Sequence, residues 1–383
     1  MRRKREIIYL IGFIFSLPIA LTSYINSSFV SSFIGEKSVG AIYAAGSIVS
    51  IIALLVVPQI FRKVGGYKFL LSVIALDSFA VLLFAFSKDV WSVILLFILS
   101  FTFNVLIYFS LDELLKIFSK DSATGKIRGA YLTLCSLAWV LAQFALGTFW
   151  GEFSFKMIYL TSFAFMLLFF AIACVYLRDV ENPAYDKSNI KKYVKEFFNN
   201  KNLFRAYGIS SLLQFFYCWM VIYTPIYLSS HMGFSWKEIS IIFTVMLLPF
   251  LIIPFNLGKY ADKIGERKIL MFGFTLVSLA TLSLFFIHGH ILWIWAVLLF
   301  ATRTGASMIE VTSDAYFFKH IRPENEEFLG VYRSASPVAY IIGPIFASLV
   351  FIFIPSFKLI YIILGIIMLC GVYLSSTIRR NDI

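Results

Sequence analysis

The sequence predicts an all-α polytopic membrane protein with 12 transmembrane helices in two pseudo-symmetric six-helix bundles. Three observations predict this fold class. Of the 383 residues, 60% are hydrophobic and 14% are charged, whereas soluble domains have about 25% charged residues. The apolar residues form runs long enough to cross a bilayer, and one long polar segment divides these runs into two sets of six. The composition excludes a disordered chain, a disulfide scaffold and a conventional soluble enzyme.

The hydrophobic runs define the expected spans, since a membrane helix needs about 20 mainly apolar residues. The expected spans are residues 7–27, 39–58, 69–87, 90–111, 129–150, 157–177, 206–229, 239–257, 269–287, 291–312, 330–353 and 358–376. The long connection lies between the sixth and seventh runs. We therefore expect an N-terminal bundle of residues 1–178, a cytoplasmic linker of residues 179–205 and a C-terminal bundle of residues 206–383.

The linker contains a helical pattern. Its apolar residues recur at i, i+3, i+4, i+7 and i+8, and lysines lie between them; these residues are Ile190, Tyr193, Val194, Phe197 and Phe198. This spacing predicts an amphipathic helix with a basic face, which suits the anionic inner leaflet of a membrane. A binding site for a calmodulin-type partner is the alternative that fits the same pattern.

The basic residues indicate the orientation of the chain. The net charge is +12, from 33 Lys and Arg against 21 Asp and Glu. With the N-terminus inside, 27 of the 33 basic residues lie on inner segments, five on outer segments and one, Arg303, within a span. Because positive residues collect on the cytoplasmic side, we expect a multi-pass protein of the plasma (cytoplasmic) membrane with both termini in the cytoplasm.

The same charge distribution limits the expected partners. The basic surplus is explained by topology, so we expect contact with the lipid bilayer and a small-molecule substrate, and no binding to nucleic acid. The four cysteines lie within apolar runs and have no metal-ligand spacing. We therefore expect no metal and no cofactor, and a chain that acts as a monomer.

Two short inner loops are related at an offset of 200 residues. Residues 258–268 read GKYADKIGERK and residues 58–68 read PQIFRKVGGYK, so that Gly265 lies over Gly65 and Lys268 over Lys68. Asp112 and Asp314 close the fourth and tenth expected spans at an offset of 202. The agreement between these offsets and the span count predicts an internal repeat, which is common in transporters.

The pattern GxxxDxxGxRK on a short inner loop resembles the signature loop of the major facilitator superfamily. The resemblance covers the whole chain in topology and implies a secondary transporter that works by alternating access between two six-helix halves. The first-half copy departs from the family pattern, because Pro58 replaces its glycine and Arg62 its aspartate.

The resemblance also implies an inner gate. Its expected members are the motif residues and two partners: Gly258, Asp262, Gly265, Arg267, Lys268, Asp314 and Arg333. Asp262 should then face Arg333 and Arg267 should meet Asp314, so that the cluster latches the inner face closed. The alternative is a basic loop that only fixes topology.

Three ionisable residues fall inside expected spans, where a charge costs several kcal/mol and marks a functional candidate. They are Asp77, Arg303 and Glu310. Arg303 and Glu310 share one helix face but lie about 10 Å apart along the axis, so they should line one pathway without pairing directly. Glu310 and Asp77 are candidates for proton coupling. The alternatives are a structural ion pair for Arg303 and for Asp77, and a place in the inner gate for Glu310.

Uncharged polar and aromatic residues inside the spans suit a small amphipathic solute. The candidate cavity residues are Arg303, Gln214, Tyr217, Asn104, Gln143, Tyr24 and Trp139. For any single aromatic residue packing is the competing role, whereas a buried amide requires partners.

The leading functional hypothesis is a proton-coupled secondary transporter of a small organic solute. The sequence has no GxxxxGK[ST] loop for phosphate binding. A polytopic membrane enzyme and a non-transporting receptor are the competing classes, although an enzyme would require clustered catalytic residues and the four histidines are scattered. Drug-type efflux and uptake symport of an anionic or polar solute both remain as alternatives.

Overall fold

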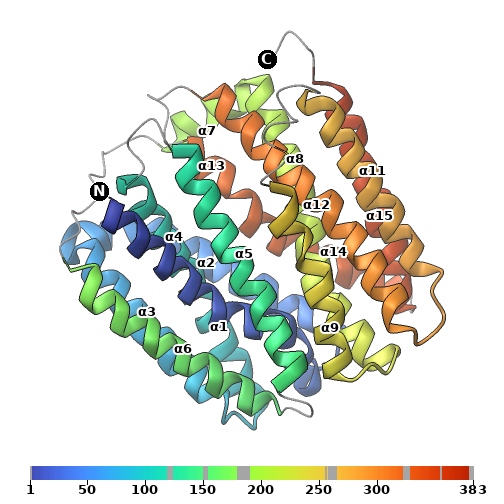
Figure 1. Cartoon of the computed structure of the whole chain (residues 1–383), viewed down its shortest axis with the longest axis horizontal. Helices are drawn as coiled ribbons and strands as arrows, with labels where there is room; N and C mark the ends of the chain where they lie inside the picture. Colours follow the sequence, from blue (N-terminus) through green and yellow to red (C-terminus); the bar gives the residue numbers. More distant parts are fainter. Residues whose placement is uncertain are drawn as a thin grey trace. The chain divides into compact units, whose positions relative to one another are not determined.

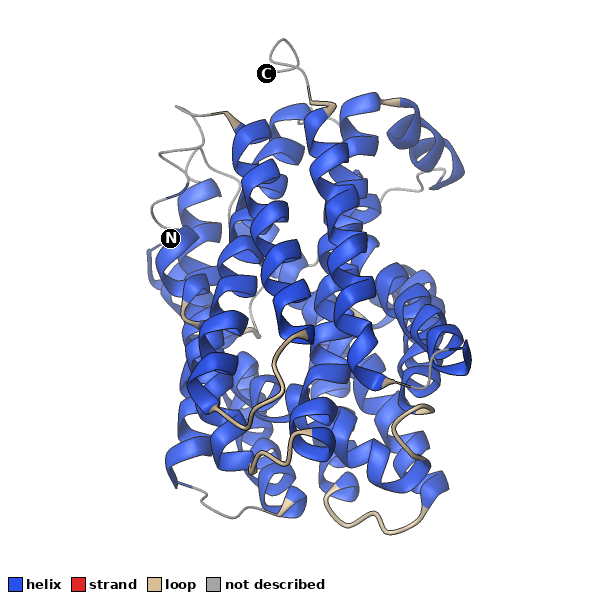
Figure 2. Ribbon diagram, turned by 90° about the vertical axis from the view of Figure 1, so that its right-hand side faces the viewer, coloured by secondary structure: helices blue, strands red, loops and turns tan. Residues whose placement is uncertain are grey.

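The computed structural model describes residues 2–118, 124–149, 154–178, 190–254, 257, 265–321, 328–353 and 356–378. Every regular element within these ranges is a helix (Figure 2). The chain divides into two compact units. One comprises Met1–Asp186 and Ser235–Ser240, and the other comprises Lys187–Phe234 and Ile241–Ile383.

The first unit contains six long helices. They are α1 (Arg2–Ile34), α2 (Val39–Val64), α3 (Gly66–Phe84), α4 (Val90–Phe118), α5 (Thr124–Phe149) and α6 (Phe155–Tyr176). Pro18 lies inside α1, where it removes one backbone donor. Neighbouring side chains use the carbonyl groups near this break: Ser162 Oγ donates to Pro18 O at 3.2 Å and Gln143 Nε2 donates to Ala20 O at 2.7 Å.

The second unit begins with the linker helix. Its elements are α7 (Ile190–Asn199), α8 (Lys201–Ile226), the π-helical turn η1 (Tyr227–His231), most of α9 (Trp236–Leu247), α11 (Glu266–Phe285), α12 (Leu292–His320), α13 (Phe328–Arg333), α14 (Ala335–Phe353), the 3₁₀ turn η3 (Phe357–Leu359) and α15 (Ile360–Ser376). The residues of α9 up to Ser240 are assigned to the first unit. A break at Ser334 separates α13 from α14. Pro337 lies three residues beyond this break, where its missing N–H cannot continue the α13 ladder.

The helix contacts repeat from one unit to the other. In the first unit α1 packs against α4, α5 and α6, and α3 packs against α4 and α6. In the second unit α8 packs against α12, α14 and α15, and α11 packs against α12 and α15. Figure 1 shows α3 beside α6 in one unit and α11 beside α15 in the other. The two halves therefore share one helix arrangement, as the sequence repeat predicts.

Ten helices of the described residues are long and apolar enough to cross a membrane. The two other expected spans, 39–58 and 129–150, fall on α2 and α5, whose apolar stretches Val39–Leu54 and Thr133–Thr148 are shorter. Large apolar side chains are exposed on the outside of the helices, among them Trp91, which is 80% exposed. Such surfaces are expected to face lipid.

The two related glycines have the same backbone conformation. Gly65 has φ 86° and ψ 147° immediately before α3, and Gly265 has φ 87° and ψ 141° immediately before α11. Side chains are disfavoured at such a positive φ. The offset of 200 residues between the two loops is therefore reproduced by the backbone.

The predicted amphipathic helix of the linker is present as α7, but its apolar residues are divided between two environments. Phe197 is fully buried in the second unit. Its ring lies 5.6 Å from Phe328, 6.1 Å from Tyr207 and 6.4 Å from Phe317, measured between centroids. Phe198 is 38% exposed. The sequence alone predicted a face lying on the membrane, whereas the structure uses Phe197 to dock α7 on α8, α12 and α13.

This docking predicts a difference between two adjacent phenylalanines. Phe197→Ala should lower the free energy of unfolding by about 3–5 kcal/mol, because it leaves a cavity among buried rings. Phe198→Ala should cost about 1 kcal/mol or less. Thermal unfolding of the detergent-purified chain measures both. If the two variants lose stability equally, α7 is not anchored through Phe197.

Candidate functional site

The clearest polar cluster of the second unit surrounds Arg303 on α12. This side chain is 2% exposed. The central carbon of its guanidinium lies 5.2 Å from the ring centroids of both Phe216 and Tyr217 on α8. Cation–π contacts of this kind contribute about 2 kcal/mol when they are desolvated. Two aromatic rings thus hold the guanidinium in place without neutralising it.

The close approach of α11 and α12 directs Arg303 toward α8. A Cβ atom added to Gly305 would lie 2.6 Å from the carbonyl oxygen of Gly273 on α11. Only glycine allows two backbones to approach so closely. Arg303 precedes Gly305 by two residues, which is about 200° around a helix. When Gly305 faces α11, Arg303 therefore points away from α11.

The Arg303 guanidinium forms no ion pair in the described part of the chain, and Glu310 acts on it electrostatically without pairing directly. Its Nε atom is buried and forms no hydrogen bond. In the second unit, ion pairs join Lys319 to Glu266 and Arg333 to Asp314. A buried charge without a partner is unfavourable by several kcal/mol. The site is therefore suited to an anion.

Tyr217 connects Arg303 to Glu310. Its ring lies beneath the guanidinium, while its hydroxyl donates a hydrogen bond of 2.9 Å to Oε2 of Glu310. Glu310 is partly buried and lies seven residues after Arg303 on α12. The two charged residues share a helix face, as the spacing predicts, and one tyrosine bridges them.

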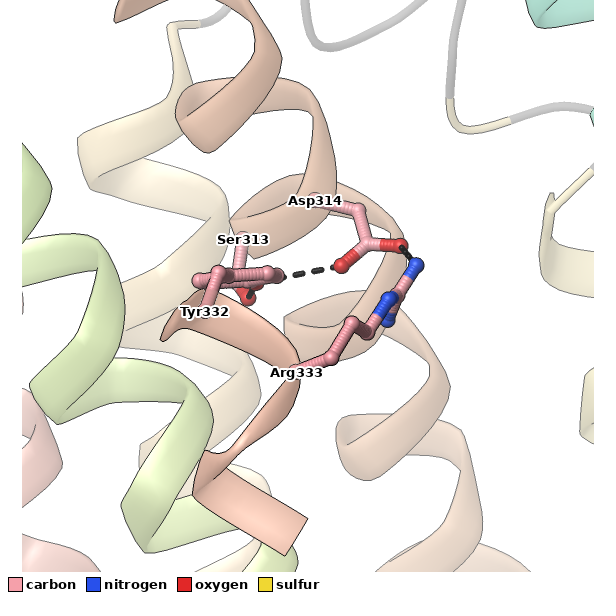
Figure 3. A network of polar contacts seen from close by, with 4 residues as sticks. All are labelled: Ser313, Asp314, Tyr332 and Arg333. Carbon is pink, nitrogen blue, oxygen red and sulfur yellow. Dashed lines mark hydrogen bonds and ion pairs between the residues drawn. The ribbon is translucent and has the colours of Figure 1, made fainter. Parts of the chain in front are cut away.

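A second polar network lies four residues further along the same face of α12 (Figure 3). Tyr332 donates a hydrogen bond of 3.0 Å to Asp314 Oδ1, and Arg333 Nη2 lies 3.1 Å from Asp314 Oδ2. The Ser313 hydroxyl lies 2.7 Å from the Tyr332 hydroxyl. The Tyr332 ring stacks on Phe317 at 4.1 Å. The network ties α13 to α12.

This network differs from the expected pairing of Asp314 with Arg267. Both oxygens of the Asp314 carboxylate are engaged by α13, through Tyr332 and Arg333. Arg267 and Lys268 are exposed in the first turn of α11. The expectation was wrong because Arg267 lies on the outer side of its helix.

The inward-facing residue of that turn is Glu266, which the motif did not single out. Glu266 is 1% exposed, and its Oε1 lies 2.6 Å from Lys319 Nζ at the end of α12. An acid in the first helical turn also interacts favourably with the helix dipole, and this was the signal available in the sequence. Gly265 precedes it with its positive φ. Gly258 and Asp262, the other two motif residues, lie outside the described residues.

Three of the predicted cavity residues meet between α1 and α5 in the first unit. The rings of Tyr24 and Trp139 form an edge-to-face pair with centroids 5.9 Å apart. Gln143 is 2% exposed and donates to the carbonyl of Ala20. Here the amide binds helix α5 to helix α1.

Two further candidates, Asp77 and Asn104, are brought together by Ser100. Asp77 on α3 is 1% exposed and accepts a hydrogen bond of 2.7 Å at Oδ1 from the Ser100 hydroxyl on α4. Asn104 Nδ2 donates to Ser100 O at 2.8 Å. Within the described ranges no Lys, Arg or His pairs with Asp77, so the structural ion pair considered for it is not found there.

The predicted residues thus fall into separate groups. Arg303, Tyr217 and Glu310 lie together, and Gln214 is partly buried on α8 three residues before Tyr217. The residues that sequence reasoning missed are Phe216, Ser100, Ser313 and Tyr332. Each of the four contacts a polar or charged residue on a neighbouring helix. No local sequence signal therefore distinguished them from packing residues.

Comparison with known proteins agrees with this architecture. Residues 114–324 and, in a second match, residues 209–382 match the family described as Major Facilitator Superfamily. No curated protein sequence matches the chain.

Among solved structures, the chain is similar to a crystal structure of a mutant of the nucleoside transporter NupG, with a TM-score of 0.76 and 10% sequence identity over 97% of this chain and 98% of the other. It is also similar to a bacterial homolog of the human lysosomal transporter Spinster in an inward-facing, unoccupied conformation. That comparison gives a TM-score of 0.69 and 11% identity over 97% of this chain and 94% of the other.

These structural similarities show the fold, and the family match extends over more than half of the sequence. The chain therefore belongs to the major facilitator superfamily, and it is a multi-pass secondary transporter of the membrane rather than an enzyme.

Proposed function

We propose that this transporter moves a small organic anion across the plasma membrane together with a proton, by alternating access and with both termini in the cytoplasm. The observation that carries the proposal is the buried Arg303 guanidinium, which lies against Phe216 and Tyr217 and forms no ion pair in the described part of the chain. The separation of 27 inner from five outer basic residues supports the orientation.

The chemistry of Arg303 favours an anionic group on the substrate. A guanidinium binds a carboxylate through two parallel hydrogen bonds, and its attraction for an anion is stronger where water is excluded. The rings of Phe216 and Tyr217 add an apolar surface beside the charge. Such a site suits an organic solute that carries both a carboxylate and an apolar or aromatic part.

The chemistry of Glu310 favours proton coupling. Ionised Glu310 accepts the Tyr217 hydroxyl and places a negative charge on the face that carries Arg303. The other charges that act on Glu310 belong to Asp314 and Arg333. A proton on Glu310 removes its negative charge, so it increases the attraction of this region for an anionic substrate. Substrate and proton then favour each other's binding, as symport requires.

Arg303→Ala tests the substrate site. Transport in proteoliposomes should fall at least about tenfold, because loss of one partner of a buried charge pair costs 2–5 kcal/mol. The unfolding temperature should stay close to that of the wild type, since the variant also removes an uncompensated charge.

The substrate screen for this test includes nucleosides as well as organic anions, because a similar solved structure is that of a nucleoside transporter. Arg205→Ala is the control, because Arg205 lies at the beginning of α8 and bonds Asn202. Undiminished transport by Arg303→Ala would remove Arg303 from the site.

Glu310→Gln tests proton coupling. Glutamine can still accept the Tyr217 hydrogen bond but cannot titrate, so the variant should exchange substrate while losing accumulation driven by a pH gradient. In the wild type, affinity for the anion should fall as pH rises through the pKa of Glu310, and this dependence should vanish in the variant. Flux and internal pH are measured together. Normal gradient-driven accumulation by Glu310→Gln would contradict the proposal.

The inner gate is a further part of the proposed function. Asp314, Arg333 and Gly265, with the motif residues outside the described ranges, are proposed to latch the inner face, whereas Arg267 and Lys268 are exposed and do not bind Asp314. In the structure the latch residue Asp314 is bound by α13, just before the break at Ser334. Release of Asp314 would free α13 to move at this break.

Asp314→Asn therefore tests the latch. The variant removes the negative charge of the Asp314 carboxylate and so weakens its contacts to Tyr332 and Arg333. A reporter cysteine on the inner face should therefore be labelled several-fold faster. Asp89→Asn is the control, because Asp89 is an exposed carboxylate that bonds only Ser92 among the described residues. An unchanged labelling rate for Asp314→Asn would refute the latch.

A further inference from the structure

The buried carboxylate of Asp77 lies in the first unit and takes no part in the proposed transport site of the second unit. It is 1% exposed and stands near the middle of the span Gly66–Phe84. The flanking α3 residues Val73, Ile74, Ala80 and Val81 are buried and apolar. No cationic side chain in the described ranges pairs with the carboxylate. A charge in such surroundings requires compensation.

The cluster around Asp77 contains more hydrogen-bond acceptors than donors. The Ser100 hydroxyl donates its proton to Asp77 Oδ1. Within the described part of the chain, Ser100 is the side chain that donates to this carboxylate. Asn104 Oδ1 is buried and has no hydrogen-bond partner. The carboxylate therefore has one donor, and an amide oxygen one helical turn along α4 from that donor has none.

The orientation of the Asn104 amide is fixed by its own contacts. Nδ2 donates to the Ser100 carbonyl at 2.8 Å and lies 3.4 Å from the Ser100 hydroxyl. A flipped amide would place an oxygen against that carbonyl, which is repulsive. The unmatched atom is therefore the carbonyl oxygen of the amide.

The helix geometry places these oxygen atoms on one side of α4. Ser100 and Asn104 are four residues apart and share a helix face. That face meets α3, since Ser100 contacts Asp77 and the two helices pack together. Carboxylate, hydroxyl and amide oxygens are the ligand types that hard cations prefer.

We propose that Asp77, Ser100 and Asn104 form a binding site for one monovalent metal cation of the size of Na⁺. A single positive charge neutralises the single carboxylate, whereas a divalent ion would leave an uncompensated charge in an apolar region. The Asp77 carboxylate and the Asn104 amide oxygen, which receives no hydrogen bond, supply direct ligands, and the Ser100 hydroxyl adds a third. The site goes beyond proton coupling at Glu310 and does not depend on it.

The test measures the unfolding temperature of the purified full chain in NaCl and in choline chloride at equal ionic strength and fixed pH. Ligands that bind only the folded state raise its stability with concentration. The wild type should show a saturable rise with Na⁺, and equilibrium binding of radioactive Na⁺ should show one displaceable site. Neither measurement requires a substrate, so failure here is distinct from failure of the proposed transport.

The variants distinguish this site from a general salt effect. Asp77→Asn should lose the Na⁺ response, and Asn104→Ala should shift the Na⁺ midpoint at least about tenfold upward. Asp89→Asn, which alters an exposed carboxylate, should respond as the wild type does. If Asp77→Asn fails to fold, the binding measurement on Asn104→Ala decides. No Na⁺ response in the wild type, or a response to pH alone that Asp77→Asn removes, overturns the proposal.

Discussion

Inside an apolar span a polar group has no water to bind, so its partner must come from the protein or from a ligand. Many contacts between helices in this chain meet that requirement. Gln143 donates to Ala20 O, Trp219 Nε1 donates to Gly343 O at 2.8 Å, and Ser278 Oγ donates to Gly365 O at 2.7 Å. Each bond fixes the rotation of one helix against another. Arg303 and Asp77 differ from these residues, because neither charged side chain forms an ion pair within the described part of the chain.

Asp77 and Arg303, which form no ion pair within the described part of the chain, lie on helices that do not correspond in the repeat. Asp77 is on α3, the third span of the first unit, and Arg303 is on α12, the fourth span of the second. At the offset of 200 residues, the equivalent of Asp77 on α11 is Val277, which is apolar. Related helix arrangements thus carry different chemistry, consistent with separate roles for the two units. Arg303 belongs with the proposed anion site and Asp77 with the proposed cation site.

The linker helix α7 connects this chemistry to the end of α12 that carries Asp314. Phe197 of α7 packs against Phe317 and Phe328, and Phe317 stacks on Tyr332, which binds Asp314. The docking of α7 and the position of the Asp314 carboxylate therefore depend on one group of aromatic rings. A change in this packing would act on the same carboxylate that the inner latch is proposed to use.

The sequence by itself determined the helical class, the number and order of the apolar runs, the 200-residue repeat through Gly65 and Gly265, and which spans carry charges. These properties follow from local composition and spacing. Arg303, Tyr217 and Glu310 were each predicted as candidates, but only the tertiary structure showed that Tyr217 bridges the other two. It also decided that Arg333 rather than Arg267 pairs with Asp314, and that Ser100 binds both Asp77 and Asn104. Partners are chosen by the rotation and packing of helices far apart in the chain, and an apolar pattern constrains that rotation too weakly to identify them.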